Sequence, residues 1–374
     1  SVQKSQFAQF QLRTFQEETL ENGLRIIFIE DQSLPVVNLS LLVQAGSLNE
    51  SSGDEGLNFL TANLLEQGSN NRSATLIADS LGQIAAEYQA GPGVDYTMLN
   101  ISALSNEKKR MLELYTDILL NPSFQLKEIE RVREQQLAMI KKAQDNPSGF
   151  ADQILDRVVF GSHPYATPAF GTEKSVKVFN RSDILKFYLK FYRPNNSILS
   201  VTGKFDDTYR KQVKAAFSGW QKRDISQLSD RSQKILNPGS LKLFTKPGLQ
   251  QSQVRFAHAG IKRSDADYLK LRLAFMILGG SFSSRLNQKI RDDLGLTYSI
   301  HSSVDARKEV GSFEISTFTR NEKLAETIIE TKKMLNDFAN DGVSSTEVES
   351  AKALMAGQFP SAIETMPKLA QNLM

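Results

Sequence analysis

A short pattern of residues occurs twice in this chain. Leu99–Lys108 and Phe313–Lys323 both carry Ile-Ser as their third and fourth residues and Asn-Glu-Lys at their end. In both places the alternating pattern of a strand gives way to the spacing of an amphipathic helix. At 374 residues the chain is also too long for one ordinary hydrophobic core. The repeat therefore predicts two copies of one α+β domain, joined by a linker.

Residues 222–240 are the best candidate for that linker. The stretch is polar and ends in Pro238-Gly239-Ser240, after which a strand-and-helix pattern starts again. The first domain is then expected at 1–221 and the second at 241–374. The second domain is expected to be incomplete at its end, because the helical pattern that begins near Ala353 stops at Met374 without a cap or a helix breaker.

Composition excludes several classes of function. The 45 basic and 42 acidic residues nearly balance, and no Lys/Arg tract is interleaved with aromatic residues, so we expect no nucleic-acid partner. No apolar run approaches the ~18 residues of a membrane-spanning helix. The absence of cysteine excludes disulfides, thiolate zinc sites and cysteine nucleophiles. A chain that begins at Ser1 rather than Met is compatible with removal of an export signal.

Hydrophobic periodicity predicts the individual elements. Strands are expected at 24–30, 36–43, 96–104, 197–202, 241–244 and 253–257, and helices at 56–66, 73–85, 107–120, 126–144, 149–160, 181–191, 206–217 and 264–278. A turn is expected at Asn22-Gly23.

The stretch from Gly279 to Ile300 is the most informative part of the second domain. Gly279 and Gly280 predict a turn whose backbone can approach another group closely. A short helix follows, and then a strand is expected to open at Leu296. Arg291 and Tyr298 flank this reversal, where they could together hold a carbonyl or an acidic group. The alternative interpretation makes Arg291 a surface charge and Tyr298 an aromatic residue at the edge of the core.

Gly-Gly-Ser-Phe-Ser-Ser-Arg-Leu at 279–286, Arg291 and Gly-Leu-Thr-Tyr at 295–298 resemble the second-domain signature of pitrilysin-type zinc peptidases, which include the mitochondrial processing peptidase. Short motifs in the order and spacing of that family extend the resemblance over nearly the whole chain: 20–24, 45–47, 56–57, 68–69, 121–124, 163–165, 170–172 and 191–196. The resemblance implies two homologous domains of the pitrilysin/LuxS-like kind, each a mostly antiparallel sheet covered by helices. It also implies that Arg291 and Tyr298 bind substrate.

Active members of that family carry an H-x-x-E-H zinc motif on the helix after Gly-Leu, and a distant Glu completes the metal site. Gly56-Leu57 and Gly68-Ser69 set the register in this chain. The two His positions, the Glu position and the third ligand position then fall on Phe59, Asn63, Ala62 and Met139, respectively. The three histidines, His163, His258 and His301, have no partner at a ligating interval and are interpreted as structural residues. We therefore expect no metal and no cofactor in this chain, and no zinc-dependent hydrolysis by the chain alone.

Because the zinc half of the signature is lost and the Arg291/Tyr298 half is kept, the sequence predicts a non-catalytic subunit of a pitrilysin-family peptidase complex. Such a subunit would shape the chamber and bind an extended peptide or unfolded protein beside a homologous, zinc-containing partner. Gly279 and Gly280 would admit the peptide backbone. Two alternatives remain, a scaffolding subunit without peptide binding and a stand-alone peptide-binding clamshell. The expected location is the periplasm, with the cytoplasm as the alternative.

Overall fold

The structure is a computed structural model that describes residues 13–225 and 240–374. It confirms the expected fold class, because helices and two separate sheets alternate along the chain and all but one of the strand pairs are antiparallel. Within the described ranges, no helix is both long and apolar enough to cross a membrane.

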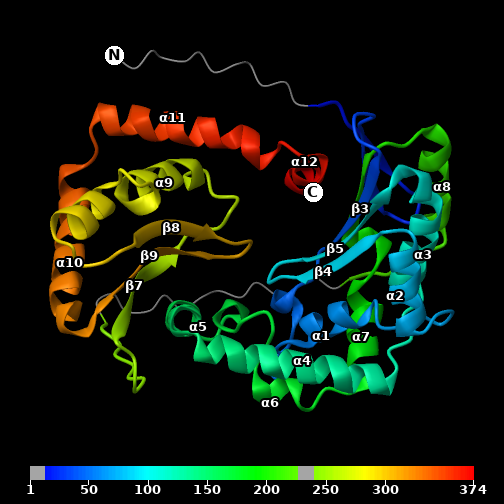
Figure 1. The fold of residues 1–374 in the computed structure, drawn as a ribbon, viewed down its shortest axis with the longest axis horizontal. Helices are drawn as coiled ribbons and strands as arrows, with labels where there is room; N and C mark the ends of the chain where they lie inside the picture. The colour runs from blue at the N-terminus through cyan, green and yellow to red at the C-terminus, as the bar shows by residue number, and fades with distance from the viewer. Residues whose placement is uncertain (1–12, 226–239) are drawn as a thin grey trace. The chain divides into compact units, whose positions relative to one another are not determined.

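The first sheet has six strands in the order β1-β2-β6-β3-β5-β4 (Figure 1). Its strands are β1 (Gln16–Thr19), β2 (Arg25–Glu30), β3 (Val36–Val43), β4 (Glu87–Pro92), β5 (Thr97–Leu104) and β6 (Ser197–Gly203). Only β2 and β6 run parallel. β1 and β2 form the expected hairpin, and Gly23 adopts the positive φ of +86° that this turn requires.

Strand β2 is buried on both faces of this sheet, and its successive residues show how. Ile26 and Phe28 belong to the large core under the helices of the same unit, whereas Ile27 and Ile29 pack against the C-terminal helix α12 (Met366–Leu373). Because side chains alternate across a strand, a strand covered on both sides must be apolar at nearly every position. This accounts for the continuous apolar run in β2.

The second sheet has three strands in the order β7-β9-β8, and it repeats part of the first. Its strands are β7 (Gln251–Gly260), β8 (Ile300–Ala306) and β9 (Gly311–Arg320). β9 lies between two antiparallel neighbours, as β5 does in the first sheet, and both strands lead through a 3₁₀ turn into a long helix. The two copies of the Ile-Ser/Asn-Glu-Lys pattern therefore adopt the same element order.

The helices agree with the periodicity to within a few residues over most of the chain. Their bounds are α1 (Leu57–Leu64), α2 (Ala74–Gln83), α3 (Lys108–Leu120), α4 (Leu126–Asp145), α5 (Pro147–Phe160), α6 (Glu173–Val176), α7 (Arg181–Phe191), α8 (Asp207–Ser218), α9 (Tyr268–Phe275), α10 (Leu324–Asp341) and α11 (Ser345–Ala362). Ser73 and Asp206 cap the helices that follow them, since their side chains accept from the backbone N–H three residues later.

Two of the expected strands are wrong in detail. Leu241–Phe244 is not a strand, and the side chains of Leu241 and Leu243 are 80% and 75% exposed, so no sheet lies against them. The strand expected to open at Leu296 begins at Ile300 instead. The helix expected at 264–278 begins at Tyr268 and changes to a π-helical segment, η5 (Met276–Gly280), before it ends.

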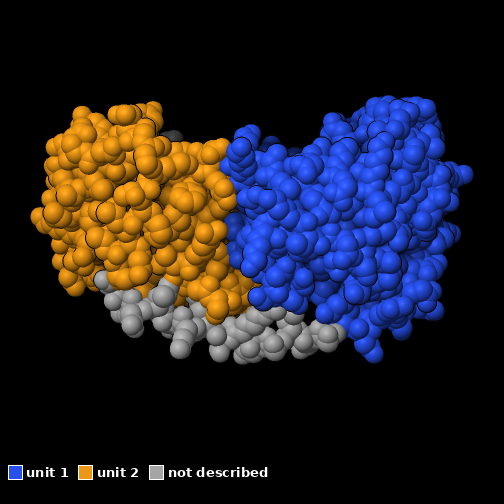
Figure 2. All heavy atoms as spheres, turned by 90° about the horizontal axis from the view of Figure 1, so that it is seen from below, with its two compact units in different colours: residues 1–142, 167–230, 360–374 blue, residues 143–166, 231–359 orange. Residues whose placement is uncertain are grey.

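The described residues form two compact units (Figure 2). Unit 1 takes in the described parts of 1–142 and 167–230 together with 360–374, and unit 2 takes in 143–166 and the described part of 231–359. This division differs from the linear one at 222–240, because α5 joins unit 2 and α12 joins unit 1. Each of these helices packs against partners far away in sequence, which local patterns do not reveal. Most of the expected linker, 226–239, lies outside the described residues.

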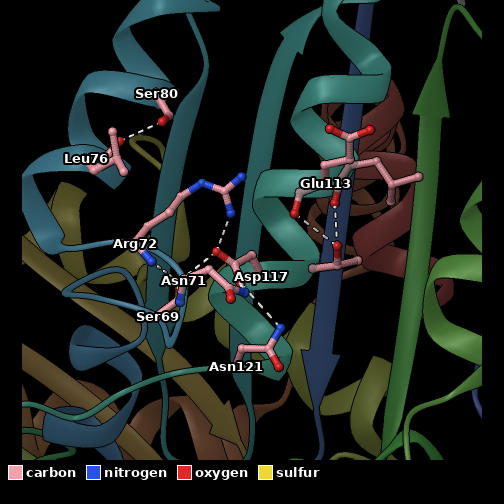
Figure 3. A network of polar contacts seen from close by, with 10 residues as sticks. Ser69, Asn71, Arg72, Leu76, Ser80, Glu113, Asp117 and Asn121 are labelled. Atoms are coloured by element: carbon pink, nitrogen blue, oxygen red, sulfur yellow. Dashed lines mark hydrogen bonds and ion pairs between the residues drawn. The ribbon is translucent and has the colours of Figure 1, made fainter.

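A buried carboxylate in unit 1 fixes the loop that follows α1 (Figure 3). Asp117 of α3 accepts hydrogen bonds from Ser69 Oγ at 2.7 Å and Asn71 Nδ2 at 2.6 Å, and it forms an ion pair with Arg72. Burial alone would raise the pKa of Asp117, but these three partners together lower it. The Gly68-Ser69 motif is thus held against α3 at the point where the chain turns from α1 to α2.

Candidate functional site

The sequence singles out two regions, and the first is the helix α1, where zinc would be bound in active relatives of the resembled family. The start of α1 is held by a buried carboxylate. Glu50 accepts from the backbone N–H of Gly56 at 3.0 Å and of Asn58 at 2.7 Å, and Gln136 Nε2 donates to the Gly56 carbonyl at 3.0 Å. Burial raises the pKa of Glu50 well above its ordinary value, although the two N–H bonds oppose this effect. Gly56 has a φ of +93°, and an added Cβ would lie 2.8 Å from the Phe170 carbonyl oxygen.

The four positions that the resemblance assigns to the zinc ligands and the catalytic Glu carry side chains that do not suit a zinc ion. Ala62 is completely buried, and the Asn63 amide donates to the Phe59 carbonyl at 2.8 Å within the helix. Met139, on α4, is 44% exposed. Zinc prefers thiolate, imidazole and carboxylate donors, and a phenyl ring, a methyl group, a bonded carboxamide and a thioether supply none of these.

The three histidines lie in unit 2. His163 is buried; its Nδ1 accepts from the Tyr165 N–H at 3.2 Å and its Nε2 lies 2.9 Å from a Glu309 carboxylate oxygen. His258 lies within β7, because this strand extends beyond its expected end at residue 257, and its ring contacts the Ala259 carbonyl. His301 is exposed at the start of β8. Over the two described ranges, no three His, Asp or Glu side chains gather where they could hold a metal ion.

The second region is a pocket of about 620 Å³ in unit 2, and all four residues singled out from the second-domain signature line it. They are Gly279, Gly280, Arg291 and Tyr298. The remaining lining residues are Ser281, Phe282, Asn287, Thr297, Ser299, Ile300 and His301. A pocket of this size is in the range of those that hold small ligands or one or two peptide residues.

The walls of the pocket are tied together by one buried amide. Asn287 Nδ2 donates to the carbonyl oxygens of Ser281 at 3.0 Å and Ile300 at 3.1 Å, and to Ser284 Oγ at 3.0 Å. These three acceptors come from the loop after the glycines, from the turn before the helix and from the start of β8. Asn287 also opens a second π-helical segment, η6 (Asn287–Asp293), which carries Arg291. Insertions of this kind re-aim side chains and are frequent at functional sites.

Gly279 and Gly280 let other atoms approach the backbone closely, and the atoms closest to Gly279 belong to other residues of this chain. A Cβ added at Gly279 would lie 2.8 Å from Ser302 Oγ and 2.9 Å from Leu286 Cδ1. At Gly280 the nearest atoms would be 3.2 Å away. Gly279 therefore lets the end of η5 pack onto β8, and both glycines also line the pocket. Admission of a peptide backbone at this point remains a prediction.

Side-chain hydroxyls replace strand pairing just before β8. Thr297 Oγ1 donates to the Phe318 carbonyl at 2.6 Å, and Thr319 Oγ1 donates to the Leu296 carbonyl at 2.6 Å. The segment is thereby fastened to β9 without joining its ladder, which explains why the strand begins at Ile300. This arrangement leaves the neighbouring Tyr298 side chain 84% exposed, so Tyr298 is not an aromatic residue of the core edge.

Arg291 is not a simple surface charge either. Its guanidinium carbon lies 3.8 Å from the centroid of the Phe282 ring, its Nε lies 2.8 Å from Asp292 Oδ1, and its side chain is only 21% exposed. Such stacking of a guanidinium on an aromatic face is a cation–π contact. Phe282 itself is 77% exposed.

Sequence reasoning singled out four of the lining residues but not Phe282 or Asn287, although Phe282 lies within the quoted Gly-Gly-Ser-Phe signature. It interpreted His301, which also lines the pocket, as a structural residue. A large aromatic residue beside two glycines and before a helix is a signal that could have identified Phe282. The position of Asn287 in the site depends on its contact with the Ile300 carbonyl at the start of β8, and the local sequence carries no sign of this contact.

Comparisons with known proteins agree with this division into two regions. A model described as insulinase, peptidase family M16, matches residues 25–173, and a model described as the peptidase M16 inactive domain matches residues 179–355. The chain belongs to the M16, or pitrilysin, family. In this M16 chain, α1 falls within the first match and the pocket falls within the second.

Curated relatives extend the similarity over nearly the whole M16 chain. An uncharacterized zinc protease of Bacillus subtilis is 25% identical over 358 residues, which are 95% of this chain and 86% of that protein. An uncharacterized zinc protease of Rickettsia bellii is 29% identical over 352 residues, which are 94% of this chain and 84% of that protein.

Solved structures have the same fold. A peptidase M16 inactive domain from Pseudomonas fluorescens has a TM-score of 0.83 at 25% identity, covering 92% of this chain and 84% of that one. A protease from Helicobacter pylori has a TM-score of 0.86 at 20% identity, covering 96% of this chain and 88% of that one.

Proposed function

We propose that this chain is a non-catalytic subunit of an M16 peptidase complex, and that it binds extended peptide through the pocket around Arg291 and Tyr298. The observation that carries the proposal is the gathering of Gly279, Gly280, Arg291 and Tyr298 around one pocket. A pocket with a partly shielded arginine and an exposed tyrosine offers hydrogen-bond donors to a peptide.

The non-catalytic part of the proposal has separate support. The donor set at Phe59, Ala62 and Asn63 does not suit zinc, and Ala62 is fully buried, which leaves no side chain there to activate a water. The Pseudomonas fluorescens structure, which is similar over 92% of this chain, is described as an inactive domain. In this proposal the catalytic zinc belongs to a homologous partner with an intact H-x-x-E-H motif.

The proposal is tested by affinity purification of the tagged chain from its native host, followed by a peptidase assay on the eluate. A homologue in equal amount and cleavage that a chelator abolishes are the expected results. Elution of the chain alone, with neither cleavage nor peptide binding, would overturn the proposal and favour a scaffolding role.

Variants of the pocket then test its contribution within the complex. Arg291→Ala and Tyr298→Phe are each expected to lower kcat/KM by roughly 10²-fold, the scale of one lost charge-stabilising donor. Tyr268→Phe removes a tyrosine hydroxyl from α9, outside the pocket, and is the matched control. Unchanged rates in both pocket variants would remove this pocket from the reaction.

A further inference from the structure

The chemistry of the pocket wall indicates which part of a peptide it would hold. Among the residues that line the pocket, Arg291 is the one cation, and no aspartate or glutamate is present. The Asn287 amide and the Thr297 hydroxyl are already committed to backbone carbonyl groups. The pocket lining therefore presents a cationic donor and contains no carboxylate of its own, and such a surface suits an anionic group.

The contacts of Arg291 leave its outer nitrogens available. One face of the guanidinium is covered by the Phe282 ring at 3.8 Å, and the Nε edge is occupied by Asp292 at 2.8 Å. Within the described part of the chain, neither Nη atom of Arg291 forms a hydrogen bond. A planar guanidinium held in this way retains a fork of N–H donors toward the pocket that it lines.

A carboxylate matches such a fork better than a carbonyl oxygen does. Its two oxygens accept two parallel N–H bonds, and charge-assisted pairs of this geometry are roughly twice as strong as neutral hydrogen bonds. The ring of Phe282 supports this orientation, because stacking restricts rotation of the guanidinium before the ligand arrives. Asp292 acts in the opposite sense, since it offers the same cation an intramolecular carboxylate.

We infer that this pocket selects peptides that place a carboxylate against Arg291, and that Phe282 is the positioning residue that holds Arg291 for this contact. The inference rests on the proposed peptide-binding function and names its ligand chemistry. The carboxylate is either the free C-terminus of the peptide or an acidic side chain within it. Asp292 lowers the affinity by competing for the guanidinium.

Calorimetric titration of the full chain with three N-acetylated peptides of alanine, leucine and serine tests the inference. One peptide ends in a free carboxylate, one ends in an amide, and one ends in an amide but contains a single glutamate. We expect either charged peptide to bind on the order of tenfold more tightly than the neutral amide, a difference of one charge-assisted pair. The preferred charged peptide identifies the source of the carboxylate, and raised salt should reduce the preference.

Single substitutions test which residues cause the preference for peptides that carry a carboxylate. Arg291→Gln should abolish the preference for charged peptides, and Asp292→Asn should raise their affinity a few-fold. Phe282→Leu should reduce the preference, whereas Phe282→Tyr should retain it. Phe244→Leu, which removes another exposed aromatic side chain outside the pocket lining, should leave it unchanged.

The possible outcomes distinguish a failure of the carboxylate inference from a failure of the proposed peptide-binding function. Equal affinity for all three peptides would overturn the carboxylate inference and leave peptide binding intact, whereas no binding of any peptide would contradict the proposed function as well. A full preference in Phe282→Leu would overturn the positioning role of Phe282.

Discussion

Arg285 and Glu347 form a bidentate ion pair that joins the segment leading into η6 to the start of α11. Arg285 Nε lies 2.6 Å from one carboxylate oxygen of Glu347, and Nη2 lies 2.8 Å from the other. Arg285 also donates to the Gly342 carbonyl, and its guanidinium lies over the Phe338 ring of α10. The arginine of the Ser-Ser-Arg-Leu signature thus supports the site from outside the pocket lining.

Glu347→Gln should lower the free energy of unfolding by about 1 kcal/mol at neutral pH, because the pair is bidentate but partly exposed. The hydrogen bond from Arg285 lowers the pKa of Glu347 from 4.5 to about 2. Since the folded-state pKa is depressed, this stabilisation is present above about pH 4.5 and is lost as the pH falls toward 2. Urea unfolding at pH 7 and pH 2.5 should show a larger deficit at pH 7, because most of the stabilisation is lost at pH 2.5. Glu349→Gln, at a side chain that is 74% exposed, is the control, and an equal Glu347→Gln deficit at both pH values would contradict the assignment.

Gly279→Ala should destabilise unit 2 by roughly 1–3 kcal/mol, because the added methyl group would meet Ser302 and Leu286 in a packed region. Gly280→Ala is the matched neighbour. Its Cβ would have no atom closer than 3.2 Å, so its effect should stay within about 1 kcal/mol of zero. Thermal unfolding of both variants measures the difference. Equal losses would show that the Gly279 contact with β8 is not what requires glycine.

How much of the fold can be predicted from the sequence depends on how far apart in the chain the contacting residues are. The strand at Val36–Val43 and the helix at Arg181–Phe191 have the predicted bounds, because their hydrophobic periods and caps are local. The placement of α5 and α12 was not predictable in this way. Ile363 and Met366 pack against Ile27 and Ile198, which are far away in sequence.

The candidate site shows the same limit on a smaller scale. Gly279, Arg291 and Tyr298 were found from a signature and a short reversal of the chain, and they line one pocket. Arg291, which stacks on Phe282, lies in the π-helical segment η6, and this segment changes the helical period around Arg291. A helical wheel with the ordinary period of 3.6 residues does not contain that change.

Asn287→Asp tests the amide that joins the walls of the pocket. The substitution keeps the shape but replaces the donating N–H group with an oxygen, which would then face the Ser281 and Ile300 carbonyl oxygens. We expect a loss of about 2–3 kcal/mol, because buried acceptors would be left without a donor. Chemical unfolding and the peptide titration should both report the change. Asn372→Asp, which alters an exposed amide on α12, should change stability by no more than about 0.5 kcal/mol.

Asp117→Ala should destabilise unit 1 by about 2–4 kcal/mol, because Ser69, Asn71 and Arg72 all lose the carboxylate that they share. The pKa of Asp117 is lowered from 3.8, so its contribution is present above that pH and is lost as the pH falls through the folded-state value. Urea unfolding should therefore show a deficit at pH 7 that shrinks in strong acid. Glu113→Ala, one turn earlier on α3 and exposed, is the control, and similar losses in both variants would contradict the network.

Asp156 should give unit 2 a pH dependence of the opposite sign. Burial raises the pKa of Asp156 from 3.8 to about 6; Glu314 and Asp305 add to the rise, whereas Arg307 opposes it. A raised folded-state pKa means that the stabilisation is fully present below about pH 3.8 and is lost as the pH rises through 6. Asp156→Asn keeps the side chain neutral, and Arg307 retains Asp305 at 2.7 Å. The stability of Asp156→Asn relative to the unsubstituted chain should therefore rise between pH 4 and pH 8, by on the order of 2 kcal/mol.

Thermal and urea unfolding across that pH range measure this difference. Asp207→Asn, at a side chain that is 91% exposed, should show no such trend. A relative stability of Asp156→Asn that stays flat or falls with pH would mean that Arg307 compensates fully for the burial of Asp156. In that case the packing of α5 against the second sheet would not depend on the protonation of this carboxyl.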